Sequence, residues 1–169
     1  MEIATLGAGC FWCIEALLLN VPGVVSVDVG YSGGHIDAPT YKMDCEGETG
    51  HAEVAQIKFN SEVISYKNLL STFFEIHNPT TLNRQGNDIG TQYRSCIFYH
   101  DENQLKIAES LKNKIQKKYD DEIVTEIMPF EKFYFAEDYH QNYFNNNKNQ
   151  PYCNFVIKPK LDKFLNEKK

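Results

Sequence analysis

The sequence predicts an α+β fold, a ferredoxin-like split βαβ two-layer sandwich with additional C-terminal helices and long ordered loops. Two observations lead to this prediction. Stretches of alternating hydrophobicity are interleaved with stretches at the helical period, in the order β-α-β-β-α-β followed by α-β. The chain has 169 residues, 42% of them hydrophobic, which suits a single domain over residues 1–169 with a continuous core.

The first part of the chain carries a strand, a helix and a second strand. Residues 2–8 read as a short strand. Residues 11–20 place Phe, Ile and two Leu at the helical period, and Pro22 and Gly23 then end the helix. Residues 24–32 alternate between apolar and polar side chains as a strand does.

Residues 51–130 are predicted to form three more strands and two more helices. Residues 51–60 alternate as a strand, and residues 65–78 carry an apolar helical stripe. Residues 94–100 are strand-like, and residues 101–119 run from acidic to basic along an amphipathic helix, as the helix dipole favours. Residues 123–130 predict a further strand, which completes the order given above.

Three long stretches between these elements lack periodicity, over residues 33–50, 78–93 and 135–155. Loops beyond about 12–15 residues in a compact domain are usually functional or disordered. These stretches combine glycines with Tyr, Asp, Glu, Asn and His rather than the composition of disordered segments, so we expect ordered, functional loops. A terminal helix is predicted over residues 160–168.

Charge and composition exclude several classes of partner. The net charge is -6, so the chain lacks the basic surface that phosphate backbones bind, and we expect no nucleic-acid partner. No apolar run approaches the roughly 18 residues of a membrane span, and no secretory signal pattern follows Met1. Five scattered cysteines are unlike a disulfide framework and favour the reducing cytoplasm.

Cys10 lies immediately before the first turn of the predicted helix 11–20. Unsatisfied N–H groups and the helix dipole favour a thiolate there, which predicts a lowered pKa and a nucleophile. No Lys, Arg or His is adjacent in sequence, so other parts of the fold must complete the activation. A buried cysteine beside two aromatic residues can instead be a packing residue, and the pattern alone leaves both interpretations open.

Cys10 and Cys13 also form a CxxC pair, which is the spacing of disulfide-exchange enzymes. A zinc site would require further ligands, and Cys45, His51 and His35 are the candidates. These residues do not form a second closely spaced pair, so we expect no metal.

Glu53 lies near the start of the predicted strand 51–60, on the same face as Ala55 and Ile57. If that face is the core, burial raises the pKa of the carboxyl group and makes it a general acid near neutral pH. If the strand is frayed at this end, Glu53 is solvated. The alternation by itself does not decide between the two.

Five ordered motifs together resemble the A-type peptide-methionine sulfoxide reductases, and they extend over nearly the whole chain. They are GCFWC (9–13), GYSGG (30–34), PTYKMDCEGETGHAEV (39–54), QGNDIGTQYRS (85–95) and AEDYHQNY (136–143). The resemblance implies reduction of the S epimer of methionine sulfoxide, free or in proteins, by a monomer that repairs oxidised proteins. It also implies that no metal or organic cofactor is needed.

The resemblance assigns chemical roles to matching positions. Cys10 would attack the sulfoxide sulfur, and Glu53 would protonate the sulfoxide oxygen. Tyr41 and Tyr93 would hydrogen-bond the same oxygen, and Asp88 would hold the polar network and the substrate. These roles suit the chemistry, because the sulfoxide oxygen is a poor leaving group unless it is protonated or hydrogen-bonded.

Phe11 and Trp12 would form an apolar cradle for the substrate methyl group, which explains their position beside Cys10. Attack would leave a sulfenic acid on Cys10, and a second thiol would condense with it to a disulfide that thioredoxin or a similar dithiol reduces. Cys13 stands where the common family motif has Gly, and Cys153 stands where many relatives have a resolving cysteine. Both are candidates for the second thiol.

The other two cysteines, Cys45 and Cys96, are expected to be structural. Two other functions remain open at this stage. A general CxxC disulfide oxidoreductase would use Cys10 and Cys13 but would leave Glu53 without a role. A non-catalytic reader of oxidised methionine would bind the sulfoxide without turning it over.

Overall fold

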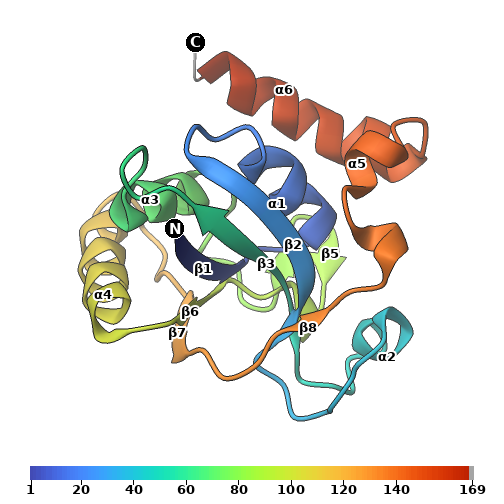
Figure 1. Cartoon of the computed structure of the whole chain (residues 1–169), viewed down its shortest axis with the longest axis horizontal. Coiled ribbons are helices and arrows are strands. Elements are labelled where there is room, and N and C mark those ends of the chain that lie inside the picture. Colours follow the sequence, from blue (N-terminus) through green and yellow to red (C-terminus); the bar gives the residue numbers. More distant parts are fainter. Residues whose placement is uncertain (168–169) are drawn as a thin grey trace.

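The computed structural model describes residues 1–167 and contains a six-stranded sheet in the order β7-β6-β1-β3-β2-β8 (Figure 1). The strands are β1 Glu2–Gly7, β2 Val24–Ser32, β3 Ala52–Phe59, β6 Cys96–Tyr99, β7 Glu126–Pro129 and β8 Tyr134–Phe135, and β4 Arg84–Gln85 pairs with β5 Asp88–Ile89 in a separate hairpin. The helices are α1 Phe11–Leu18, α2 Tyr41–Cys45, α3 Tyr66–Glu75, α4 Glu102–Gln116, α5 Tyr143–Asn146 and α6 Lys158–Glu167.

The sheet order shows how the first βαβ unit is built. Strands β1 and β2 flank β3, and both pair with it in antiparallel fashion. They therefore run parallel to one another, are joined through α1, and are separated by the inserted strand β3. The predicted α+β class is confirmed. The strands of the predicted β-α-β-β-α-β order are β1, β2, β3 and β6, which follow one another along the chain as expected.

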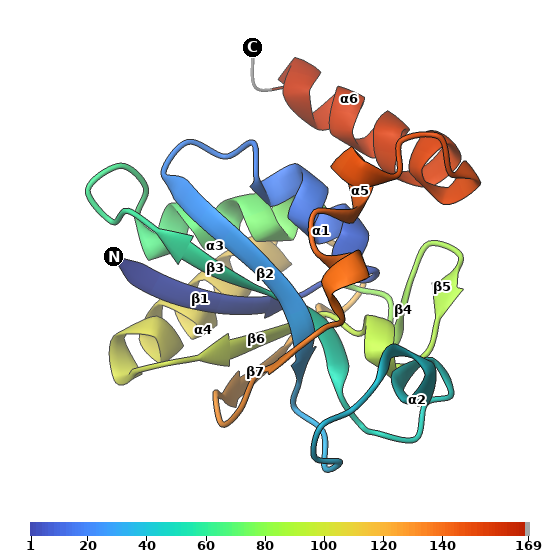
Figure 2. The same ribbon diagram turned by 45° about the vertical axis from the view of Figure 1, so that its right-hand side comes forward.

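The main core lies between the sheet and the helices α1, α3 and α4, which Figure 2 shows behind the strands. Leu6 and Ile57 from the strands meet Leu18, Leu70 and Leu111 from the helices in this layer. Side-chain caps begin two of these helices, α3 and α4: Ser65 Oγ accepts a hydrogen bond from Asn68 N, and Asp101 Oδ1 accepts one from Gln104 N. Burial of the apolar helix faces therefore fixes α1, the helix that carries the CxxC pair, against the sheet.

The three stretches predicted as ordered loops contain short elements that periodicity does not reveal. Residues 33–50 include α2, residues 78–93 include the β4–β5 hairpin and a 3-10 turn, and residues 135–155 include a second 3-10 turn and α5. Elements of two to five residues are too short to show a period, and tertiary contacts hold them in place. A π-helical turn, Cys153–Ile157, leads directly into α6.

Several boundaries differ from the predictions by a few residues. The helices predicted over 11–20, 65–78 and 101–119 are shorter at their C-terminal ends, and the strand predicted over 123–130 begins at Glu126. The terminal helix begins at Lys158 rather than at residue 160, and residue 168, its predicted end, lies outside the described residues. Within residues 1–167, no helix has the length and apolar character to cross a bilayer.

Candidate active site

The predicted site residues converge on the N-terminus of α1. An apolar cluster there contains all of them except Glu53 and Asp88: Cys10, Phe11, Trp12, Cys13, Tyr41, Tyr93 and Cys153. Hydrogen bonds join the other two residues to this cluster, as described below. The sequence motifs are thus brought together from α1, α2, β3, the hairpin β4–β5 and the segment around α5.

Cys10 is the N-cap of α1 and is 7% exposed. The residue before it, Gly9, has a φ of 82°, and a Cβ atom there would lie 2.8 Å from Gln85 Cβ. Gly9 N donates a hydrogen bond of 3.2 Å to the carbonyl oxygen of Tyr93. A glycine at this position therefore lets the chain before Cys10 pass close to the 78–93 segment and draws Tyr93 towards the thiol.

The pKa values of the two thiols of the CxxC pair are shifted in opposite directions. Burial, above all, raises the pKa of Cys10 well above its usual value, and the hydrogen bond with Cys13 and the nearby Glu53 act in the same direction. The hydrogen bond with Cys10 lowers the pKa of Cys13 against the effect of burial, and the Lys160 cation adds to the lowering. The prediction that the helix N-terminus lowers the Cys10 pKa is wrong for this structure, because desolvation outweighs the helix end.

Glu53 is fully inside the protein, with 1% of its surface exposed. Strand β2 pairs with β3 up to this end of the strand, where Tyr31 lies opposite Glu53. The interpretation of a solvated strand end is therefore wrong. Glu53 Oε1 accepts a hydrogen bond of 3.1 Å from Phe11 N, whereas Oε2 has no partner among the described residues. Burial, above all, raises the pKa of Glu53 well above its usual value and so favours the protonated form of the carboxyl group.

The hydroxyl groups of Tyr41 and Tyr93 remain protonated over the physiological range. Burial, followed by the charge of Glu53, raises the pKa of both. Tyr41 is the first residue of α2, whose N-cap Thr40 accepts a hydrogen bond from Met43 N. Glu137 Oε2 accepts a hydrogen bond of 3.1 Å from Tyr41 N, so a residue 96 positions away fixes the start of this short helix.

Aromatic side chains form a wall around Trp12. The Trp12 and Tyr143 rings stack with centroids 3.8 Å apart and an angle of 10° between their planes. Trp12 Nε1 donates a hydrogen bond of 3.0 Å to His140 Nδ1, and the Tyr41 ring lies 6.0 Å from the indole. Phe11 is fully buried behind the wall.

Asp88 reaches the cluster through Tyr152. The Tyr152 hydroxyl donates a hydrogen bond of 2.7 Å to Asp88 Oδ2 and lies 3.6 Å from Cys13 Sγ. The β4–β5 hairpin thereby places an acidic residue beside the second thiol of the CxxC pair.

The remaining cysteines lie in three different environments. Cys153 is fully buried in the same cluster as Cys10 and Cys13, and burial raises its pKa. Cys96 is fully buried beneath Gly7, where a Cβ atom would come within 2.6 Å of its Sγ, as expected of a structural cysteine. Cys45, which was also expected to be structural, is exposed at the end of α2.

The alternative zinc ligands do not converge. Both ring nitrogens of His51 are engaged with backbone groups: Nδ1 accepts from Gly34 N at 2.9 Å, and Nε2 lies 2.7 Å from the carbonyl oxygen of Ile36. A Cβ atom on Gly34 would come within 2.4 Å of His51 N, so this close approach requires glycine. Across residues 1–167, no group of three or more His, Cys, Asp or Glu side chains is arranged to hold a metal.

The periodicity argument missed several residues that contact the site, namely Glu15, Glu137, His140, Tyr143 and Tyr152. Four of the five lie in or near the unperiodic segment 135–155, where aromatic and charged residues are frequent. That local composition is the signal by which the sequence could have indicated them.

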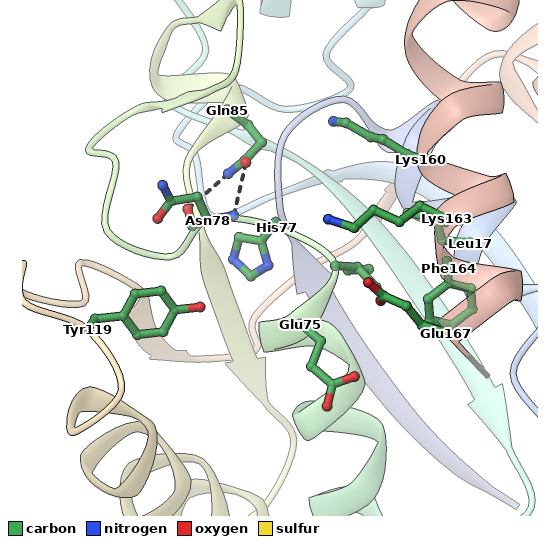
Figure 3. Close-up of a pocket in the computed structure, with 11 residues that line it drawn as sticks. Leu17, Glu75, His77, Asn78, Gln85, Tyr119, Lys160, Lys163, Phe164 and Glu167 are labelled. Atoms are coloured by element: carbon green, nitrogen blue, oxygen red, sulfur yellow. Dashed lines mark hydrogen bonds between the residues drawn. The ribbon is translucent and has the colours of Figure 1, made fainter. Parts of the chain in front are cut away.

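A separate pocket of about 340 Å³ lies between α3, α6 and the 78–93 segment (Figure 3). Lys160 and Lys163 line one side, and His77 lies at its inner end (Figure 3). Both His77 ring nitrogens have partners, at Phe73 O and Ser95 Oγ, so the imidazole is not free for acid–base chemistry. None of the predicted site residues lines this pocket.

Comparison with known proteins agrees with this arrangement. Residues 2–169 match the family model for peptide methionine sulfoxide reductase. A curated relative, peptide methionine sulfoxide reductase MsrA of Saccharolobus solfataricus, is 58% identical over 165 residues, which cover 98% of this chain and 93% of the relative. The match therefore extends over nearly the whole length of both chains.

Solved structures give the same result. Mxr1 of Saccharomyces cerevisiae in its reduced form has a TM-score of 0.85 and 41% identity, covering 90% of this chain and 88% of that one. Mxr1 in complex with Trx2 has a TM-score of 0.61 and 30% identity, covering 84% of each chain. From its sequence match over nearly every residue and from its shared fold, the chain belongs to the peptide methionine sulfoxide reductase family.

Proposed function

We propose that the protein reduces the S epimer of methionine sulfoxide, free or in proteins, to methionine, and so repairs oxidised proteins. The observation that carries this proposal is the pairing of Glu53 with the Cys10 segment. A buried carboxyl group with a raised pKa accepts a hydrogen bond from Phe11 N, the residue after Cys10, and its second oxygen has no partner among the described residues. A nucleophile beside a proton donor is what sulfoxide reduction requires.

In the first step, Cys10 Sγ attacks the sulfoxide sulfur while Glu53 Oε2 gives its proton to the sulfoxide oxygen. Tyr41 and Tyr93 donate hydrogen bonds to this oxygen as charge develops on it. The oxygen then passes from the substrate sulfur to Cys10 Sγ: the sulfur–oxygen bond of the substrate and the transient bond between Sγ and the substrate sulfur break, and an Sγ–oxygen bond forms. Methionine leaves, and Cys10 becomes a sulfenic acid. The Cys10 thiol proton returns to Glu53, so the sulfoxide is reduced by two electrons and the thiol is oxidised by two.

The aromatic wall accounts for binding of the methyl group. Trp12, with Phe11 packed behind it, presents apolar surface beside Cys10, whereas Glu53 and the two tyrosines supply the polar side. A sulfoxide whose methyl and oxygen are exchanged would place oxygen against the rings and leave the polar donors unpaired. This difference supports selection of one epimer.

In the second step, we propose that Cys13 attacks the sulfenic acid, so that water leaves and a Cys10–Cys13 disulfide forms. The two thiols are hydrogen-bonded within the first turn of α1, and Cys13 has the lower pKa of the pair. Asp88 acts through Tyr152, which lies beside Cys13. Cys153, buried in the same cluster, is the alternative resolving thiol.

Thioredoxin or a similar dithiol would then reduce the disulfide. The solved complex of Mxr1 with Trx2 supports this partner. We further propose that the protein acts as a monomer of one domain, because all of the candidate site residues come from one chain. The odd, scattered cysteines support a location in the reducing cytoplasm.

The test is turnover of a peptide containing methionine S-sulfoxide, with dithiothreitol as reductant. Wild type and Cys96→Ser, a buried cysteine outside the site, are expected to turn over, and Cys10→Ser is expected to be inactive while it still binds the peptide. Activity in Cys10→Ser would overturn the nucleophile assignment. Binding without turnover by wild type would indicate a reader, and reduction of insulin disulfides alone would indicate a general oxidoreductase.

A further inference from the structure

We propose that Glu15 is a positioning residue for the substrate wall: its carboxylate clamps the Asn142–Tyr143 turn and thereby holds Tyr143 and His140 against Trp12. This inference rests on the proposed function, because the wall is the surface that would hold the substrate methyl group. Glu15 itself is on α1, outside the set of residues that would touch the substrate.

The clamp consists of two hydrogen bonds from consecutive backbone groups. Glu15 is 2% exposed, and its Oε2 accepts from Asn142 N at 2.9 Å while its Oε1 accepts from Tyr143 N at 3.2 Å. Both carboxylate oxygens are therefore used by one turn of the chain, 127 and 128 residues away in sequence. Hydrogen bonds of backbone N–H groups to a carboxylate are stronger than those to a neutral acceptor.

The turn that Glu15 holds depends on external support. Asn142 has a φ of 54° and so occupies the left-handed region, which is uncommon for residues other than glycine and which asparagine adopts more readily than most. The helix that follows, α5, has only four residues, and its bonds back to the turn, from Asn146 N to Asn142 O at 3.2 Å and from Asn145 Nδ2 to Asn142 Oδ1 at 2.8 Å, leave Tyr143 N to Glu15. The position of Tyr143 is thus set by contacts from outside the segment, and the Glu15 contacts are made to its own N–H group.

From this turn, two contacts lead directly to Trp12. Tyr143 stacks on the indole at 3.8 Å, and His140, three residues earlier, accepts the indole N–H at 3.0 Å. Trp12 and Glu15 are three residues apart on α1, so they share one face of the helix. Helix α1 therefore contacts the wall at two points: Trp12 stacks on the Tyr143 ring, and Glu15 binds the backbone of the Asn142–Tyr143 turn.

A role in packing alone does not explain a carboxylate at this position. Burial, together with the charge of Asp28, raises the pKa of Glu15 to about 7, and the two backbone hydrogen bonds act in the opposite direction. Burying an ionisable group costs free energy unless hydrogen bonds or a paired charge compensate for the lost water. Glutamine has the same shape, but its amide offers one acceptor oxygen and would set its NH₂ group against the second backbone N–H.

The experiment compares Glu15→Gln, Glu15→Ala and a matched control, Gln104→Ala. Gln104 is also a buried helix residue whose side chain bonds backbone groups, His100 N nearby and Ile3 O at a distance of 101 residues in sequence, and it lies on α4, away from the site. Steady-state kinetics on the sulfoxide peptide give kcat and KM. Emission of Trp12, the chain's only tryptophan, reports the state of the wall independently of activity.

For both Glu15 variants we expect KM to rise about five- to tenfold, the scale of one lost aromatic contact, with kcat changed by less than about twofold. Trp12 emission should shift to longer wavelength and become more accessible to acrylamide. The Gln104→Ala protein should retain the wild-type KM and emission even though it is less stable.

Three outcomes separate the hypotheses. Wild-type KM and emission in Glu15→Gln would overturn the clamp, because packing by an isosteric side chain would then be enough. A raised KM in Gln104→Ala as well would show that general destabilisation is the cause, and would also overturn it. If wild type itself does not turn over the sulfoxide, the proposed function fails, whereas the emission measurement still tests the clamp.

Discussion

At the scale of single residues, burial decides the chemistry of the site more than position on a helix does. Glu53 is the second residue of β3 and would be an ordinary surface carboxylate if the end of the strand were solvated. Pairing with β2 extends to this residue, and its side chain is buried. Cys10 occupies a helix N-terminus, yet desolvation raises its pKa. An apolar environment thus favours the protonated form of the acid and the neutral form of the nucleophile.

This environment leads to a prediction for Glu53→Gln. Because the acid form of Glu53 is the reactive one, the rate of the first step should fall as pH rises through its raised pKa. The glutamine variant should be slower at neutral pH by about 10²–10⁴-fold, bind the peptide normally and lack this alkaline limb. Single-turnover loss of the sulfoxide across pH measures the effect; an unchanged rate or a retained limb would contradict the role of Glu53.

At the scale of elements, the question is which segment supplies the resolving thiol. Cys13 belongs to the same helix turn as Cys10 and needs no rearrangement to approach it. Cys153 begins a π-helical turn that is continuous with α6 and packs in the same cluster. Moving Cys153 towards Cys10 would disturb this turn and the helix after it, so the shorter path favours Cys13.

We therefore predict different thiol losses in a matched pair of variants. After one equivalent of methionine sulfoxide, without reductant, wild type and Cys153→Ser should each lose two thiols, because a disulfide forms. Cys13→Ser should lose one, because oxidation stops at the sulfenic acid. Thiol titration of the denatured proteins makes the measurement, and the reverse result for the two variants would assign resolution to Cys153.

At the scale of the whole molecule, a buried polar chain ties the helix layer to the sheet. His77 follows α3, and its Nδ1–H donates to Phe73 O at 2.6 Å. Its Nε2 accepts from Ser95 Oγ at 2.8 Å, and Ser95 in turn contacts Thr125 Oγ1 at 2.7 Å, just before β7. The imidazole is neutral in this chain, because burial lowers its pKa to about 4.

Protonation of His77 should therefore couple folding to acid. The folded pKa lies below the unfolded value of about 6.5, so this contribution to stability is complete above about pH 6.5 and is lost as pH falls towards 4. The difference in unfolding free energy between wild type and His77→Gln should shrink by about 3 kcal/mol over that range. Urea unfolding at several pH values tests this, and parallel curves for the two proteins would contradict it.

The sequence by itself determined the α+β class, the order of the principal strands and helices, and the motifs that identify the family. These properties are local: a period of 2 or 3.6, a helix end or a run of motif residues can be read along the chain. Eight of the nine candidate site residues could also be named in this way, since each lies within a motif, and Cys153 was named from the position of the resolving cysteine in many relatives.

Only the tertiary structure decided how those residues act. That Glu53 is buried, that Cys10 has a raised pKa and that Cys45 is exposed follow from which segments cover them. Glu15 and Tyr143 contact the site through partners more than 100 residues away. Desolvation and long-range hydrogen bonds depend on the packing of distant segments, which no local pattern in a sequence records.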